Sequence, residues 1–99
     1  MGDTGFFVYI LKCCDGSYYV GFADDVEARL LLHNSGRGAS WTARRRPVVL
    51  VYCEPANSLE HAIRRERQLK GWSRSKKEAL ITGNLAHLKS LAKRRTPVS

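Results

Sequence analysis

Two segments near the start of the chain predict a β hairpin. Residues 6–11 and 17–22 are rich in aromatic and β-branched side chains, and Asp15-Gly16 lies between them. Such segments on either side of an Asp-Gly pair are typical of antiparallel strands joined by a tight loop. A chain that begins with this hairpin must cover its apolar side chains with the segments that follow.

Those segments predict a helix, a loop and a third strand. Asp24 can cap a helix with Glu27 in the capping-box position, and Gly36 is a suitable residue to end it. Residues 35–46 are rich in glycine, serine and arginine and predict a loop. Residues 48–52 are apolar and mostly β-branched, so they predict a strand.

Helices complete the predicted domain. Asn57 or Ser58 can cap a helix that runs to residue 70. A short helix is expected from residue 73 or 75 to about residue 81, and a last helix over residues 85–93. The order β-β-α-β-α-α predicts a small mixed α/β (α+β) domain whose strands form one antiparallel or mixed sheet.

The composition fits one soluble globular domain. The chain has 99 residues, of which 43% are hydrophobic and 26% are charged. No apolar run approaches the roughly 18 residues that span a bilayer, and the first residues lack the basic region of a secretory signal. We therefore expect a cytoplasmic protein that does not act on a membrane. The three cysteines are odd in number and two are adjacent, which argues against a disulfide framework or a structural zinc site.

The net charge of +8 lies in one half of the chain. Residues 1–57 hold six basic and six acidic side chains, whereas residues 58–99 hold eleven basic and three acidic ones. A basic half on a neutral half indicates either a surface that binds a polyanion or a solvated basic face.

One carboxylate interrupts an apolar pattern. Leu59, Ala62, Ile63 and Leu69 form a stripe at helical spacing, and Glu66 lies within it. A carboxylate at a core-facing position is costly unless a metal ion, an arginine or backbone donors compensate it. Glu66 is therefore a candidate metal ligand or catalytic residue, a member of a buried ion pair, or a sign that the stripe ends early.

The first predicted helix and the hairpin hold further candidates. Arg29 and His33 are four residues apart and share one side of the helix, where they form a site or lie at the rim of the core. Tyr9, Tyr18 and Tyr19 are either packing residues or members of the same site. Together, tyrosine, arginine, histidine and a carboxylate could build a site that hydrolyses phosphodiesters.

These residues resemble the motifs of the GIY-YIG nuclease superfamily. Phe7-Val8-Tyr9 stands at the first motif and Tyr19-Val20-Gly21 at the second. Arg29, His33 and Glu66 follow in order, and the whole resembles the small stand-alone bacterial branch over about residues 6–82. The resemblance implies a three-stranded antiparallel sheet flanked by helices, in a single domain over residues 1–99 whose last part, 83–99, is a basic helical extension.

The resemblance also implies a mechanism. The family hydrolyses DNA phosphodiester bonds with one divalent cation, Mg²⁺ or Mn²⁺, and Glu66 would bind this metal. Arg29 would hold the scissile phosphate, and Tyr19 would orient water or phosphate. Tyr9 would activate the attacking water, and His33 could accept its proton because a free tyrosine pKa is far above neutral pH.

Basic and aromatic residues are candidate contacts to nucleic acid. Phosphate contacts carry little sequence information, so we expect low sequence specificity, with DNA favoured over RNA and a role in DNA repair or processing. Trp41 could stack on unpaired bases, whereas packing is expected for Trp72. The basic candidates are Arg44, Arg45, Arg46, Lys70, Arg74, Lys76 and Lys77.

Two functions besides a catalytic nuclease stay open. The first is a non-catalytic nucleic-acid-binding module that keeps the fold, and the second is a subunit that needs a protein partner to act. The set of Tyr9, Tyr19, Arg29, His33 and Glu66 favours the nuclease, because a pure binder has no need of a carboxylate facing a polyanion.

A shared site sets a condition on the hairpin loop. If Asp15-Gly16 formed a two-residue loop, Tyr9 and Tyr19 would lie on opposite faces of the sheet, because the faces alternate with a period of two. We therefore predict a loop with an odd number of residues, for instance three, or a bulge.

Overall fold

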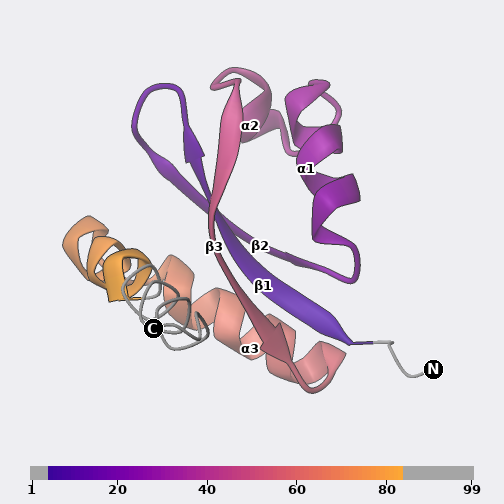
Figure 1. The fold of residues 1–99 in the computed structure, drawn as a ribbon, viewed down its shortest axis with the longest axis vertical. Coiled ribbons are helices and arrows are strands. Elements are labelled where there is room, and N and C mark those ends of the chain that lie inside the picture. The colour runs from indigo at the N-terminus through magenta and orange to yellow at the C-terminus, as the bar shows by residue number, and fades with distance from the viewer. Residues whose placement is uncertain (1–4, 84–99) are drawn as a thin grey trace, which may run out of the picture.

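The computed structural model describes residues 5–83. The helix predicted over residues 85–93 lies outside the described residues. The described part is an α+β domain in which three strands form one antiparallel sheet of order β2-β1-β3 (Figure 1). The predicted fold class and antiparallel sheet are confirmed.

The first two strands form the predicted hairpin. β1 (Phe6–Cys13) pairs with β2 (Tyr18–Ala23) so that Tyr9 lies opposite Gly21 and Leu11 lies opposite Tyr19. The Cys13 N–H donates to the Ser17 carbonyl at 2.8 Å, which leaves three residues in the loop. Gly16 ends this loop with a φ of 87°, a conformation that glycine adopts without strain. The predicted odd-residue loop is confirmed, and Tyr9 and Tyr19 share one face.

β3 (Val48–Ala56) pairs with the other side of β1 and is longer than the predicted strand. Its register shifts between Ile10 and Leu11, which marks a bulge or irregularity in the ladder. The start of β3 is fastened by Asn34, whose side-chain amide donates to the Val48 carbonyl at 3.0 Å and accepts from the Val48 N–H at 2.7 Å.

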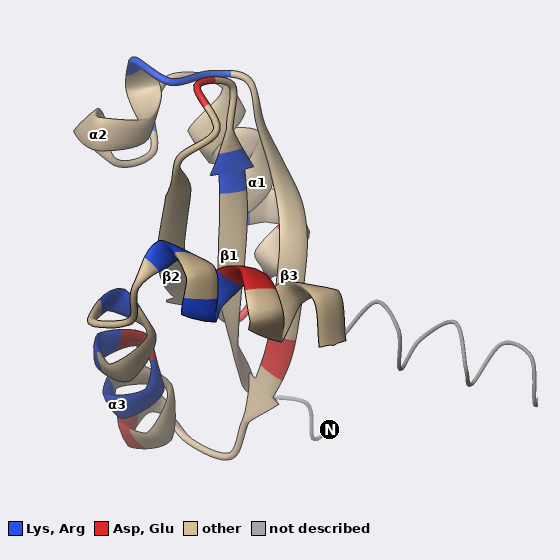
Figure 2. Ribbon diagram, turned by 90° about the vertical axis from the view of Figure 1, so that its left-hand side faces the viewer, with Lys and Arg blue, Asp and Glu red and all other residues tan. Residues whose placement is uncertain are grey.

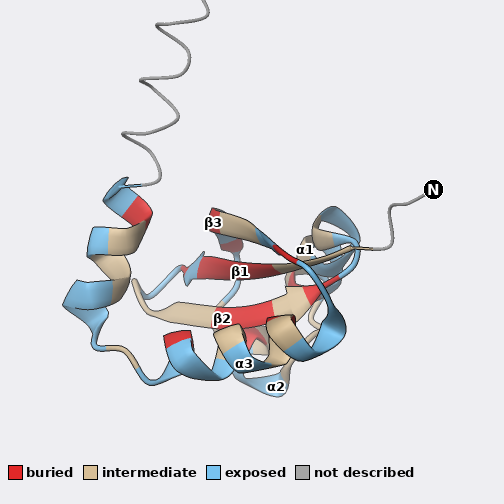
Figure 3. Cartoon of the chain, turned by 90° about the horizontal axis from the view of Figure 1, so that it is seen from below, coloured by how far each residue is buried: buried red, intermediate tan, exposed pale blue. Residues whose placement is uncertain are grey.

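Helices cover both faces of the sheet. α1 (Val26–Asn34) packs Val26 and Leu30 on the face that holds Tyr9 and Leu11. α3 (Leu59–Lys70) and a helix over residues 74–83 pack on the face that holds Val8 and Ile10. Figure 3 shows buried residues along the strands and more exposed surface on the helices.

The α3 side of the core departs in part from the predicted stripe. Ala62 and Leu69 are fully buried, but Leu59 is 46% exposed, so the stripe begins one turn later than predicted. Ser58 caps α3 by accepting from the His61 N–H at 3.1 Å, as one of the two predicted caps. Trp72 packs against the core cluster on this face, which confirms the packing role expected for it.

Two local predictions are wrong. Asp25 rather than Asp24 caps α1, because β2 extends to Ala23 and the Asp25 carboxylate accepts from the Ala28 N–H at 3.0 Å. The predicted loop over residues 35–46 contains a further short helix, α2 (Ser40–Ala43). Its single turn places Thr42 in the interior, where the side chain is fully buried.

Candidate active site

A cavity of about 280 Å³ opens at the β2 edge of the sheet. Arg29 reaches it from α1 and Glu66 from α3, although these helices cover opposite faces. Tyr9, Tyr19, Gly21 and Phe22 of the hairpin complete the lining. Four of the five predicted catalytic residues therefore line one cavity, and the fifth, His33, lies behind Tyr9.

Gly21 allows the Tyr9 ring to reach this edge. The two residues are opposite each other in the hairpin. A Cβ atom added to Gly21 would lie 2.6 Å from the Tyr9 hydroxyl oxygen, so the ring passes directly over the glycine. No larger residue fits beneath the ring in this position.

Tyr9 and His33 form a buried pair. The Tyr9 hydroxyl oxygen lies 3.2 Å from Nε2 of His33, and each residue is only 2% exposed. The other ring nitrogen of His33, Nδ1, lies 2.8 Å from Oγ1 of Thr42. Tyr19 packs edge-on against the same imidazole, with ring centroids 5.0 Å apart.

The surroundings shift the acid–base properties of this pair. Burial raises the pKa of Tyr9 to about 12, helped by Tyr19 and the Glu66 carboxylate and opposed by Arg29. Burial also lowers the pKa of His33, and the positive charge of Arg29 adds to the effect. Because its ordinary pKa is already 6.5, His33 is neutral at neutral pH and can accept a proton.

Glu66 is the one carboxylate that lines the cavity. Its side chain is 16% exposed and pairs with the ammonium of Lys70 at 2.9 Å. Lys70 is itself 52% exposed, so its ammonium can move into solvent when another cation takes its place beside Glu66. The described residues hold no cluster of three histidine, cysteine or acidic side chains.

The donors present fit a hard divalent cation rather than a soft one. The cavity offers carboxylate and phenolic oxygen and no sulfur or free imidazole nitrogen. Magnesium binds commonly through one or two carboxylates and keeps several waters. Glu66 is therefore a suitable anchor for Mg²⁺ or Mn²⁺ with water as the remaining ligands.

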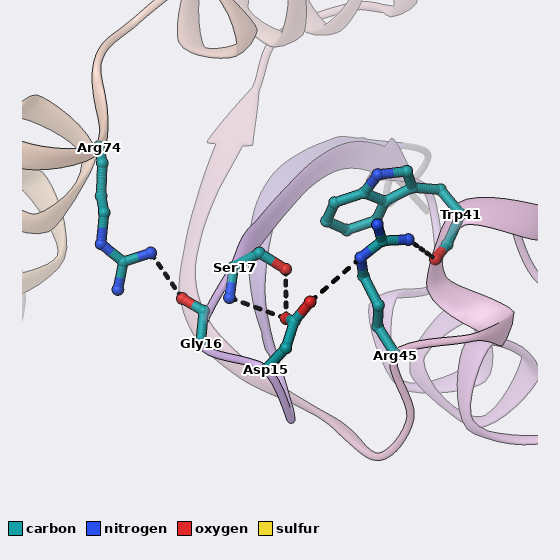
Figure 4. A network of polar contacts seen from close by, with 6 residues as sticks. All are labelled: Asp15, Gly16, Ser17, Trp41, Arg45 and Arg74. Atoms are coloured by element: carbon teal, nitrogen blue, oxygen red, sulfur yellow. Dashed lines mark hydrogen bonds and ion pairs between the residues drawn. The ribbon is translucent and has the colours of Figure 1, made fainter.

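Basic side chains lie on α3, on the helix that follows it and after α2 (Figure 2). Several are engaged within the protein. Arg45 contacts the Asp15 carboxylate at 3.2 Å and the Trp41 carbonyl at 2.8 Å, while its guanidinium lies 4.0 Å from the Trp41 ring centroid. Arg74 donates to the Gly16 carbonyl at 2.7 Å (Figure 4).

The other residues predicted to contact nucleic acid differ in how far their side chains are engaged within the protein. Arg46 donates to the Ala43 carbonyl at 2.9 Å, and Lys76 lies over the Trp72 ring. Lys77 is half-buried. Among the described residues, the Arg44 side chain has no hydrogen-bond or ion-pair partner, and with Arg46 it borders a hollow of about 440 Å³ beside α2.

Trp41 is 38% exposed and stacks on Tyr19 with ring centroids 6.0 Å apart. This contact connects the exposed indole directly to a residue of the cavity. Within residues 5–83, no helix is long and apolar enough to cross a membrane.

Two residues of the site, Thr42 and Gly38, carried no signal that singled them out in the sequence. Thr42 lies in a segment whose composition predicts a loop, and a four-residue helix has no periodicity to detect. Gly38 packs against His33 so tightly that an added Cβ would lie 2.5 Å from Nδ1. Gly21 was visible as part of the second motif, but its contact with Tyr9 depends on the register of the hairpin.

Two tyrosines of the hairpin, an arginine of α1 and a glutamate of α3 meet at one edge of an antiparallel sheet. This combination defines a domain of the GIY-YIG nuclease class. Residues 5–79 match the model of the GIY-YIG catalytic domain, and the chain belongs to this family.

Similar proteins carry the name UPF0213. One from Staphylococcus saprophyticus is 49% identical over 76 residues, which cover 77% of this chain and 93% of the relative. One from Staphylococcus aureus is 52% identical over 75 residues, or 76% of this chain and 92% of the relative. The solution NMR structure of a UPF0213 protein from Bacillus halodurans matches with a TM-score of 0.52 at 45% identity, covering 79% of this chain and 83% of that chain.

Proposed function

We propose that this protein is a metal-dependent endonuclease that hydrolyses phosphodiester bonds in DNA with low sequence specificity, in DNA repair or processing in the cytoplasm. The observation that carries the proposal is the buried Tyr9–His33 pair in a wall of the cavity that also holds Arg29 and Glu66. This arrangement supplies a proton acceptor, a phosphate-binding cation and a cation-binding carboxylate within one small space.

Tyr9 and His33 act together as the general base. With a pKa of about 12, Tyr9 is almost never a phenolate at neutral pH. Its oxygen can nevertheless take a proton from the attacking water as its own proton passes to Nε2 of neutral His33 at 3.2 Å. The relay makes the phenolic oxygen basic at the moment of reaction without the cost of an isolated buried phenolate.

Arg29 and Glu66 act on the phosphate and its charge. The Arg29 guanidinium is permanently charged and can donate two parallel hydrogen bonds to phosphate oxygens, which stabilises charge that develops there. Glu66 would hold Mg²⁺ or Mn²⁺, which supplies Lewis-acid stabilisation of the phosphate and leaving oxygen when bound. Tyr19 lines the same cavity and would orient water or phosphate.

The basic side chains outside the cavity would contact the nucleic-acid backbone. Arg44 and Arg46 border the hollow beside α2, and Trp41 stacks on Tyr19 at the cavity itself. Because Trp41 lies on α2 and contacts Tyr19, a strand that crosses α2 would pass next to the cavity. Such contacts position a phosphate and do not read bases, in agreement with low sequence specificity.

The test is cleavage of a panel of labelled DNA and RNA substrates with Mg²⁺ or Mn²⁺ at low salt, because phosphate-driven binding weakens steeply as salt rises. Wild type is compared with Glu66→Gln and Tyr9→Phe. Glu60→Gln is the matched control, because Glu60 lies on the same helix but is exposed in its first turn.

We expect wild type and Glu60→Gln to cut DNA and the two site variants to lose cleavage while keeping nucleic-acid binding. Cleavage of RNA alone would reassign the substrate. Binding without cleavage by any of the four proteins would overturn the proposal in favour of a non-catalytic binding module or a partner-dependent subunit.

A further inference from the structure

We propose that Thr42 is a positioning residue that holds His33 in the tautomer whose bare Nε2 faces Tyr9. The effect of Thr42 on the reaction rate rests on the proposed function, whereas the tautomer of His33 is a property of the protein alone. Thr42 does not line the cavity, and its side chain is connected to the site by its hydrogen bond to His33.

The hydrogen-bond donors around Thr42 determine the tautomer. The Thr42 hydroxyl donates to the Ala39 carbonyl at 2.9 Å. A hydroxyl has one proton, so towards His33 at 2.8 Å the same oxygen can only accept. With the Thr42 proton directed to the Ala39 carbonyl, Nδ1 of His33 carries the proton of the neutral ring, and Nε2 presents a lone pair to the Tyr9 hydroxyl.

Burial makes this assignment strict. Thr42 is fully buried, and Tyr9 and His33 are 2% exposed. Water is thus kept from His33 and Thr42 as an alternative donor or acceptor, and the protons between Nε2 of His33 and the Ala39 carbonyl need partners that the protein supplies. A ring with its proton on Nε2 would present a donor to Tyr9 and could not receive the Tyr9 proton.

The segment that carries Thr42 is fastened to the hairpin loop. The Arg45 N–H donates to the Thr42 carbonyl at 2.9 Å, and the Arg45 carbonyl accepts from the Cys14 N–H at 3.1 Å. The Arg45 side chain adds the contacts to Asp15 and to the Trp41 carbonyl drawn in Figure 4. α2 is therefore held at both its backbone and its side chains, which fixes the Thr42 hydroxyl relative to His33.

A simpler role for Thr42 is local. Threonine hydroxyls in helices often bond a carbonyl one turn earlier, and this contact by itself has no bearing on a histidine. The two roles differ in what happens when the hydroxyl is lost. A local role changes stability alone, whereas a positioning role changes the protonated nitrogen of His33.

The test is long-range ¹H–¹⁵N NMR of the imidazole rings in the full chain at a pH where His33 is neutral, with His33→Gln used to assign its signals. We expect wild type to carry the proton on Nδ1 of His33. Thr42→Ser should keep this tautomer because its hydroxyl offers the same acceptor, and Thr42→Val, of nearly the same shape, should lose it. A proton on Nε2 in wild type, which needs no variant to fold, would overturn the proposal.

Kinetics give the second measurement. We expect Thr42→Val to lower kcat roughly 10- to 100-fold with KM unchanged, less than the loss of the base itself. Thr42→Ser should stay within about threefold of wild type, since its hydroxyl accepts the same bond. Full kcat in Thr42→Val would overturn the positioning role, and a wild type that cuts nothing would overturn the proposed function while the NMR result still decides the tautomer.

Discussion

The hydroxyl oxygen of Tyr9 on β1 lies 3.2 Å from Nε2 of His33, which is 24 residues further along the chain at the end of α1. Neither group is suited to be a base alone, because burial raises the pKa of the phenol and lowers that of the imidazole. The raised tyrosine pKa and the lowered histidine pKa both favour the neutral forms. The pair can therefore transfer protons during the reaction although neither group is charged before it.

Replacement of Tyr9 by phenylalanine removes the proton acceptor while keeping the ring. We expect kcat to fall by roughly 10²- to 10⁴-fold, as for loss of a general base. The control is Tyr18→Phe, because Tyr18 lies on the same hairpin with its hydroxyl bonded to Glu78 at 3.2 Å, away from the cavity. Equal rates in Tyr9→Phe and wild type would exclude Tyr9 from the chemistry.

Gly21→Ala tests the path of the Tyr9 ring. The added methyl would lie 2.6 Å from the Tyr9 hydroxyl oxygen, so the ring must move away from His33. We expect cleavage to be lost although the strand still pairs, as shown by an unchanged backbone amide spectrum outside the site. Gly83→Ala is the control, because within residues 5–83 no atom beyond its own neighbours and helix backbone lies within 4 Å of a Cβ there.

The buried His33 makes stability depend on pH. Its pKa is lowered in the folded protein, so below its ordinary value of 6.5 the unfolded chain binds more protons. The contribution of His33 to the free energy of unfolding is therefore fully present above pH 6.5 and is lost as the pH falls below this value. Urea denaturation at several pH values should show this decline, and His33→Gln should flatten it between pH 5 and roughly 7 if His33 is the cause.

A second polar network stabilises the fold without serving the site. Arg65 donates to both Glu54 oxygens, at 2.7 and 3.1 Å, and the Tyr52 hydroxyl also bonds Glu54. Burial opposes ionisation of Glu54, but the hydrogen bonds from Arg65 and Tyr52 prevail and lower its pKa.

We expect Glu54→Gln to destabilise the protein by about 1–3 kcal/mol, because Arg65 loses a charged, half-buried partner. Cleavage at a temperature where the variant is folded should be unchanged, since Glu54 does not line the cavity. A selective loss of kcat in this variant would connect the network to the site.

The elements that could be predicted from the sequence are those with a regular hydrophobic periodicity or a strong local signal. The hairpin, the third strand and the Ser58 cap follow from side-chain alternation, turn chemistry and capping. The odd-residue loop followed from a functional requirement, because Tyr9 and Tyr19 could share a face only with that register. The grouping of Arg29 with Glu66 came from their residue types and from a resemblance rather than from predicted packing, since α1 and α3 pack on opposite faces.

What could not be predicted depends on contacts between distant segments. Thr42 is a threonine in a basic loop until α2 forms and turns it towards His33. Asp24 and Asp25 are equivalent as caps until the length of β2 decides between them. Arg45 is one of three adjacent arginines, and only the folded loop shows that Asp15 and Trp41 engage its side chain.

The three-residue hairpin loop makes the site sensitive to the parity of chain length. If the loop kept three residues, one residue added or removed between Cys13 and Ser17 would shift the register of β2 against β1 and turn Tyr19 and Gly21 to the other face. A change of two residues would leave Tyr19 and Gly21 on their present face of the sheet. A single-residue deletion that is not absorbed by a shorter loop would therefore take the cavity apart while leaving the residue types of its lining unchanged.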